Sequence, residues 1–180
     1  MDDKRGRFEA QVLPHLDAAY RYARWLARSS TDADDVLQEA TLRAYRSFAD
    51  LRGADAKAWL MAIVRNCHLS AASQRQRRRL VPLPEEDDTQ DSALIATTPD
   101  PEAAAIDRDQ GRTLARLMAA LPQEHREVLA LRELEDMDYR DIAQVTGVPI
   151  GTVMSRLARA RAALRTRYLQ EAQGEVNGLR

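Results

Sequence analysis

DYRDIAQVTGVPIGTVMSRLARARAALRTR, residues 138–167, contains two apolar patterns of helical period separated by a short break. Ile142 and Val145 belong to the first pattern, where apolar residues recur three and four positions apart. Gly147 supplies a position that tolerates positive φ, and Pro149 cannot continue a helix. A second helix is expected from about Gly151. Its buried stripe is Val153, Leu157, Ala160 and Leu164.

The second helix of this pair is strongly basic away from its apolar stripe. Between residues 151 and 170 there are five Arg and no Asp or Glu. A Gly-containing turn between two helices, with a basic second helix, is typical of a helix-turn-helix that inserts its second helix into the DNA major groove. A helical hairpin with a solvated basic face is the alternative. The outward side carries Thr152, Ser155, Arg156 and Arg159, flanked by Arg161, Arg165 and Arg167.

Composition favours helices throughout the remaining chain. Of 180 residues, 44% are hydrophobic but only 5% aromatic, and Ala, Leu, Arg, Glu and Asp dominate. The net charge of −1 means that an acidic region must balance the basic helix. The expected fold class is all-α.

Residues for catalysis or metal binding are scarce. Cys67 is the single cysteine, and the three histidines have no metal-ligand spacing, so we expect neither a metal nor a cofactor. Cys67 and His68 are interpreted as a small residue beside a partly exposed imidazole. There is no nucleophile–base set and no phosphate-binding glycine loop, so an enzyme with a small-molecule substrate is not expected. No apolar run approaches membrane-spanning length, and a soluble, cytoplasmic protein is predicted.

The N-terminal part is expected to form three helices. The first, residues 8–27, is interrupted by Pro14, and Thr31 with Asp34 is expected to cap the second, residues 32–48. The second helix has an acidic face with one leucine in its middle, which suits either an ordinary surface or a docking site for a basic helix. That face consists of Asp35, Gln38, Glu39 and Leu42.

A basic segment and then an acidic one follow the third helix, which contains Trp59. Residues 65–79 hold five Arg and no acid, a charge pattern that attracts phosphates. Residues 81–101 hold four Pro and six acids without Lys or Arg, as expected of a flexible linker. The negative charge keeps such a linker soluble, or lets it occupy a basic channel. The sequence thus predicts two small helical domains, residues 1–80 and 102–180, joined by a flexible acidic linker, 81–101.

Four motifs in this order resemble a bacterial RNA polymerase sigma factor of the extracytoplasmic-function group. They are DADDVLQEA (32–40); AWL (58–60) leading to RN (65–66); LP (121–122) followed by REV (126–128); and Tyr139 through VPIGTV (148–153) to SRL (155–157). The resemblance covers about residues 8–168. It implies a non-catalytic subunit that joins core RNA polymerase, directs it to promoter DNA and is held inactive by an anti-sigma factor.

The resemblance also implies roles for individual residues. Asp35, Gln38, Glu39 and Leu42 would bind the clamp helices of the polymerase's largest subunit. Asn66 would capture a base of the minus-ten element, with Arg75, Arg77 and Arg78 near the duplex backbone. Thr152, Ser155, Arg156, Arg159 and Arg161 would contact the minus-thirty-five element, and the linker would run toward the active-site cleft.

Two departures from the family pattern and two alternatives accompany this interpretation. Met154 stands where the family commonly has a basic residue, and residues 67–73 are less charged than usual. An ordinary helix-turn-helix repressor or activator would explain the Arg helix but not the acidic face. A sigma mimic that captures an anti-sigma factor would not need to keep the Arg residues.

Overall fold

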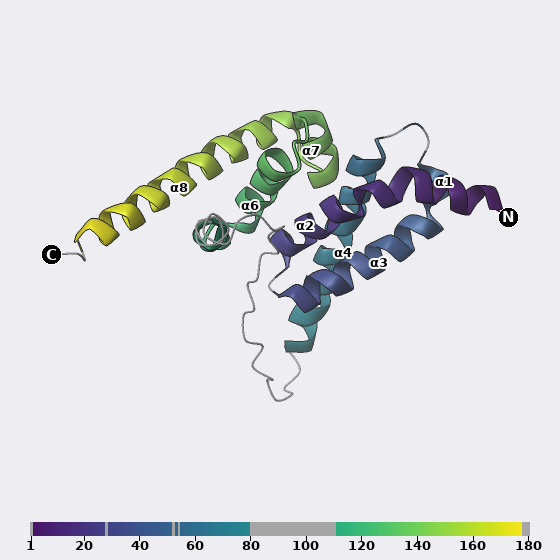
Figure 1. Ribbon diagram of the computed structural model, residues 1–180, viewed down its shortest axis with the longest axis horizontal. Coiled ribbons are helices and arrows are strands. Elements are labelled where there is room, and N and C mark those ends of the chain that lie inside the picture. The colour runs from purple at the N-terminus through teal and green to yellow at the C-terminus, as the bar shows by residue number, and fades with distance from the viewer. Residues whose placement is uncertain (1, 28, 52, 54, 80–110, 178–180) are drawn as a thin grey trace, which may run out of the picture.

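The computed structural model describes residues 2–27, 29–51, 53, 55–79 and 111–177, and all regular elements in these ranges are helical (Figure 1). The all-α prediction is confirmed. The predicted linker, 81–101, lies outside the described residues. The elements are α1 (Asp2–Val12), η1 (Leu13–His15), α2 (Leu16–Leu26), α3 (Ser30–Arg46), η2 (Phe48–Asp50), α4 (Ala56–Arg79), a helix including 111–119, α6 (Gln123–Leu129), η3 (Ala130–Leu134), α7 (Tyr139–Thr146) and α8 (Ile150–Asn177).

The N-terminal part begins with two helices separated by a single 3-10 turn. Pro14 lies in this turn, η1, as expected from its inability to continue an α-helix. The predicted cap of the next helix was wrong. Ser29, in extended conformation, is the N-cap of α3, and its Oγ accepts a hydrogen bond of 3.1 Å from the backbone N–H of Asp32. The helix therefore begins before Thr31, which lies inside it.

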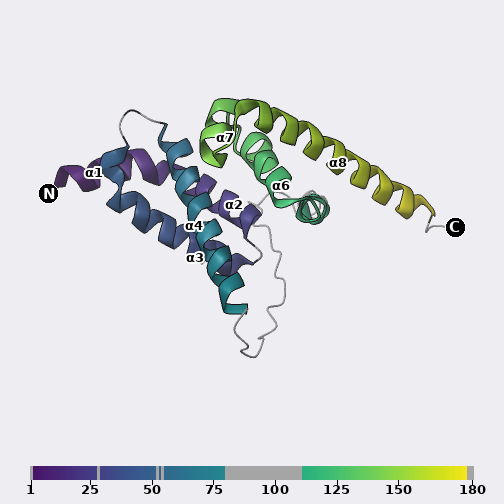
Figure 2. The same cartoon turned by 180° about the vertical axis from the view of Figure 1, so that it is seen from behind.

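Small residues let α2, α3 and α4 approach one another closely. Six alanines on these helices are fully buried, and the larger Tyr22, Leu60 and Met61 fill the remaining space. The contacts join α3 to α4 and α2 to both, forming a three-helix core with α1 along one side (Figure 2). The six alanines are Ala19, Ala23, Ala33, Ala40, Ala44 and Ala58.

The C-terminal part contains the predicted helix-turn-helix. Asp138 caps α7 by accepting backbone hydrogen bonds from Arg140 and Asp141, and Gly147 ends it with φ +69°. After Pro149, α8 starts at Ile150, one residue earlier than expected. Of the predicted stripe, Val153, Leu157 and Ala160 are buried and Leu164 is partly buried against the core.

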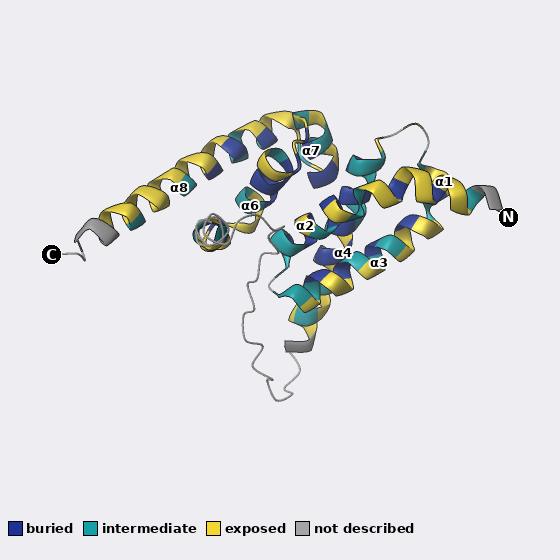
Figure 3. Ribbon diagram, viewed as in Figure 1, coloured by how far each residue is buried: buried dark blue, intermediate teal, exposed yellow. Residues whose placement is uncertain are grey.

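The two parts pack against each other through one continuous apolar cluster. α7 contacts α4, and α6 contacts α2. The buried residues concentrate where these helices meet, whereas the C-terminal half of α8 projects away and is mostly exposed (Figure 3). The helix that carries Asn66 and the helix-turn-helix are therefore neighbours in this conformation.

Candidate nucleic-acid and protein interfaces

The first turns of α8 bring together the five residues predicted to contact DNA. Arg159 and Arg161 are exposed, whereas Thr152, Ser155 and Arg156 are partly buried. The Ser155 hydroxyl donates a 3.0 Å hydrogen bond to the carbonyl oxygen of Thr152. This surface can offer hydroxyl and guanidinium donors to phosphates and base edges together.

Two of these arginines are engaged with glutamates of the same half. Arg161 donates through Nε and Nη2 to Oε1 of Glu133, at 3.0 and 2.6 Å, and this hydrogen bonding raises the pKa of Arg161. The Nη2 atom of Arg156 lies 3.8 Å from a carboxylate oxygen of Glu124. Both glutamates are exposed, so water screens these pairs and they cost little to separate.

The basic end of α4 supplies a second surface. Asn66 and Arg77 are exposed, and the carbonyl oxygen of Asn66 accepts a 2.8 Å hydrogen bond from Ser70. Arg75 is paired with Asp32 in the first turn of α3. Arg78 lies in the helix, and its side chain is outside the described set.

The acidic face of α3 remains accessible when the two parts are packed together. Asp35, Gln38 and Leu42 are exposed, and Glu39 is partly exposed, pairing with Arg43 at 2.5 Å one turn away. Tyr45, which the sequence reasoning missed, extends this face. Its ring is 41% exposed and meets the edge of Phe8 at a centroid distance of 5.1 Å. Its position three residues after Leu42 was a signal for the same helix face.

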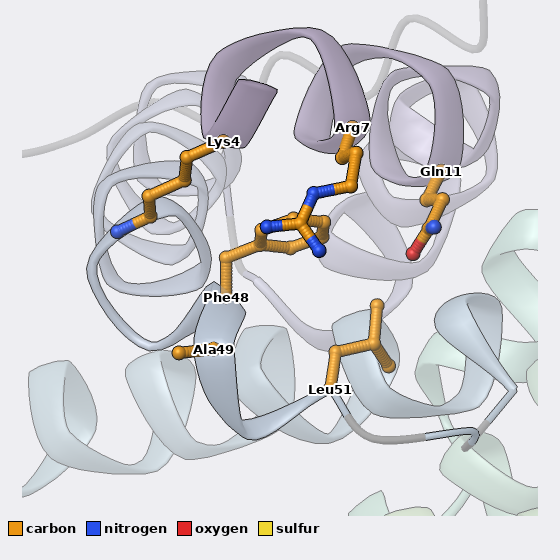
Figure 4. Close-up of a pocket in the computed structure, with 6 residues that line it drawn as sticks. All are labelled: Lys4, Arg7, Gln11, Phe48, Ala49 and Leu51. Carbon is orange, nitrogen blue, oxygen red and sulfur yellow. The ribbon is translucent and has the colours of Figure 1, made fainter. Parts of the chain in front are cut away.

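A shallow hollow lies between α1 and the turn after α3 (Figure 4). Lys4, Arg7 and Gln11 reach over it from α1, and Phe48, Ala49 and Leu51 form the opposite side. The hollow is on the N-terminal part, away from the basic end of α4 and from α8 (Figure 1).

Two buried glutamates of the C-terminal part accept hydrogen bonds from side chains of the N-terminal part. Glu135 follows η3 and accepts hydrogen bonds of 2.9 Å on each carboxylate oxygen from Nε and Nη2 of Arg21, with the Nζ atom of Lys57 at 3.7 Å. Bidentate arginine–carboxylate pairs of this kind are strong and directional. No local sequence pattern indicates this contact, because Arg21 and Lys57 are 114 and 78 residues away from Glu135 in the chain.

Glu127 makes the second crossing contact, on α6. One carboxylate oxygen accepts hydrogen bonds from the Tyr22 hydroxyl at 3.0 Å and from Nε of Arg65 at 2.6 Å. Burial, together with the neighbouring carboxylate, raises the pKa of Tyr22 well above its ordinary value. Arg65 directly precedes Asn66, so this contact holds one end of the predicted minus-ten surface against the C-terminal part.

His68 is buried, so the expectation of a partly exposed imidazole was wrong. It lies on α4, within the apolar surroundings of the core. Burial, followed by the charges of Arg75 and Arg126, lowers the pKa of His68. The imidazole is therefore held neutral in the packed conformation.

The chain matches known families and proteins over both halves. The family described as Sigma-70 region 2 matches residues 12–78, and the family described as Sigma-70, region 4 matches residues 111–164. The RNA polymerase sigma-H factor of Pseudomonas aeruginosa is 32% identical over 166 residues, spanning 90% of this chain and 86% of that protein. The ECF RNA polymerase sigma-E factor of Escherichia coli is 32% identical over 139 residues, covering 75% of this chain and 73% of that protein. The chain belongs to the family of extracytoplasmic-function (ECF) RNA polymerase sigma factors.

Another relative of this ECF sigma factor differs in length. The ECF RNA polymerase sigma factor SigE of Mycolicibacterium smegmatis is 34% identical over 165 residues, and the match covers 92% of this chain but 62% of that relative.

Two solved structures share the fold of this ECF sigma factor. The sigma factor RpoE of Bartonella quintana, in complex with the anti-sigma factor NepR, is 26% identical with a TM-score of 0.71, covering 89% of this chain and 95% of that one. CnrH, in complex with the cytosolic domain of CnrY, is 25% identical with a TM-score of 0.60, covering 93% and 87%. Within the described residues, no helix has the length and apolar character needed to cross a membrane.

Proposed function

We propose that this ECF sigma factor binds core RNA polymerase and directs it to promoters through one DNA contact in each half. The observation that carries the proposal is the presence of two basic helices, α4 and α8, in a chain whose α3 keeps an acidic and apolar face exposed. The working division is residues 1–80 for polymerase binding and the minus-ten element, 81–101 as linker, and 102–180 for the minus-thirty-five element.

The minus-thirty-five contact is assigned to the start of α8. Arg159 is exposed in the position from which a guanidinium can donate two hydrogen bonds to a guanine edge. On binding DNA, Arg156 leaves Glu124 and Arg161 leaves Glu133, and both guanidinium groups contact the DNA instead. The hydroxyl groups of Thr152 and Ser155 donate hydrogen bonds to phosphates. Because both carboxylates are exposed, the exchange replaces weak ion pairs with charge-assisted contacts to a polyanion.

The minus-ten contact is assigned to the middle and end of α4. The Asn66 amide can donate to and accept from an unstacked base, and Arg75, Arg77 and Arg78 lie along the backbone. Arg75 leaves Asp32 for a phosphate in this step. Residues 55–79 contain no Phe or Tyr and a single Trp, Trp59, for stacking, so we expect dependence on near-consensus minus-ten sequences.

Polymerase binding is assigned to the exposed face of α3. Leu42 is a single apolar anchor with Asp35, Gln38 and Glu39 around it, an arrangement that suits the clamp helices of the largest subunit if these present basic residues. The packed conformation leaves this face free, so docking on polymerase does not require the two halves to separate first.

Binding both promoter elements at the same time requires the two halves of the chain to separate. The elements are about 25 base pairs apart, which corresponds to about 85 Å along B-form DNA. In the packed conformation α7 contacts both α4, which carries Asn66, and α8, which carries Ser155, so these two helices are held together at α7. The proposed linker, residues 81–101, can span roughly 70 Å when extended, and the domains on either side add to this reach.

An anti-sigma factor is the further partner that we propose, because the sigma factors RpoE and CnrH are both seen in complexes, the first with an anti-sigma factor and the second with the cytosolic domain of CnrY. Such a partner would act by stabilising the packed conformation. Recovery of the packed halves in a complex that supports no promoter-directed transcription would support this role.

Run-off transcription with purified chain, core polymerase and a promoter library tests the main proposal. We expect promoter-directed transcripts that share two sequence elements. A chain that neither associates with core polymerase nor supports such transcripts would overturn the proposal. Strong binding to promoter DNA without polymerase would instead favour an ordinary helix-turn-helix regulator.

A further inference from the structure

Two exposed apolar side chains, Ile150 and Met154, form an apolar edge at the start of α8 and are not part of the buried core. Met154 is 53% exposed and Ile150 is 42% exposed, although both flank the buried stripe that begins at Val153. Being four residues apart, the two side chains lie on the same face of the helix. Gly151 lies between them, and a Cβ added there would meet nothing within 4 Å.

The positive charge around this edge favours a nucleic acid, and not another protein, as the partner that covers it. Residues 142–170 contain five Arg and no Asp or Glu, and Arg159 and Arg161 are exposed on the following turns. A lone exposed methionine needs no explanation on an ordinary surface. Here it is within the first two turns of the second helix of a helix-turn-helix, the N-terminal part that meets base edges in the major groove.

The major groove contains one apolar group that such a side chain can recognise. Thymine presents its C5-methyl group there, whereas the other bases present only hydrogen-bond donors and acceptors at the corresponding edge. A thioether side chain is flexible and apolar, so it can cover a methyl group without leaving a donor or acceptor unpaired. A basic residue at the same position would select phosphate or guanine instead.

We propose that Met154 reads thymine in the minus-thirty-five element by packing against its C5-methyl group, with Ile150 extending the contact one turn earlier. This inference rests on the proposed promoter-binding function and adds a base preference to it. Arg159, Thr152 and Ser155 position the helix on the DNA. Met154 adds a preference for thymine over the other bases, and because its contact is uncharged, this preference depends little on salt concentration.

Replacing thymine by deoxyuridine tests the contact, because this change removes only the methyl group. The complex of the full chain with core polymerase is titrated with promoter duplexes in which each thymine of the minus-thirty-five element is replaced in turn. We expect about fourfold weaker binding at one or two positions, from about 0.8 kcal/mol per buried methyl group and about 1.4 kcal/mol per tenfold change.

Two variants tie the effect to this side chain. Met154→Ala should bind thymine and deoxyuridine duplexes equally, and Met154→Leu should keep most of the difference. Leu169→Ala is the matched control, because Leu169 is an apolar residue farther along α8 that is 47% exposed; this variant should behave as the unmodified chain does.

The outcomes separate this inference from the proposed function. Absence of all promoter-directed binding would refute the function itself. Normal promoter binding without sensitivity to deoxyuridine at any position would refute thymine reading alone. Weaker polymerase association in Met154→Ala, with an unchanged thymine preference, would assign the edge to a protein partner and also refute the inference.

Discussion

Glu135→Gln should loosen the contact between the two halves. The substitution keeps the size of the side chain but removes the charge that receives two 2.9 Å hydrogen bonds from Arg21 and attracts Lys57. A hydrogen bond to a charged group contributes about 1.5–3 kcal/mol. The Arg21 side chain is 55% exposed, so hydration by water offsets part of this free energy when the two halves separate.

We therefore expect a loss of about 2 kcal/mol in the free energy that favours the packed over the separated conformation, or about a thirtyfold change in their ratio. This is below the about 3–5 kcal/mol seen when a buried pair loses a partner, because the cations left behind can be hydrated. Arg21 also keeps a carbonyl acceptor in the Gln side chain.

The assay is a distance distribution between dyes on the exposed positions Ala10 in α1 and Gln170 in α8, each replaced by cysteine. The native Cys67 is buried, and burial raises the pKa of its thiol, so it should label poorly. We expect a larger population at long dye separation in Glu135→Gln, with an unchanged helical circular dichroism signal.

Glu133→Gln is the matched control. Glu133 is an acid of the same short segment, but its partner Arg161 belongs to the same half of the molecule. This variant should keep the distribution of the unmodified chain. An identical distribution in Glu135→Gln would refute the reasoning that the buried carboxylate holds the halves together.

The remaining predictions concern the individual sites. Arg159→Ala should weaken recognition of the minus-thirty-five element by about 1–3 kcal/mol in holoenzyme binding titrations; if Arg165→Ala had the same effect, a specific role for Arg159 would be excluded. Leu42→Asp should impair association with core polymerase at unchanged thermal stability, whereas Leu169→Asp should not; normal holoenzyme assembly would remove α3 from the interface. The pKa of His68 is lowered, so the unfolded chain binds a proton that the folded chain does not. The free energy of unfolding should therefore fall as the pH drops below about 6.5, and His68→Gln should flatten this dependence in denaturant titrations.

The helix-turn-helix could be predicted from the amino-acid sequence alone. Gly147 as a residue with positive φ and the stripe from Val153 to Ala160 both act over a few residues, so local geometry and helical period suffice to predict them. The cap at Asp138 acts over the same short range but was not predicted. The same short-range physics predicted the break at Pro14. It misplaced the cap of α3 by two residues, because Ser29 and Thr31 are both suitable capping residues.

How the two halves meet depends on contacts between residues far apart in the chain. The pairs Arg65–Glu127 and Arg21–Glu135 join residues 62 and 114 positions apart. His68 is buried as well, although no local pattern requires it. In the sequence, Glu127 and Glu135 are indistinguishable from glutamates that face solvent. A carboxylate can be buried only where other parts of the chain supply opposite charges and hydrogen-bond donors. The period of the apolar residues does not show which distant residues will supply them.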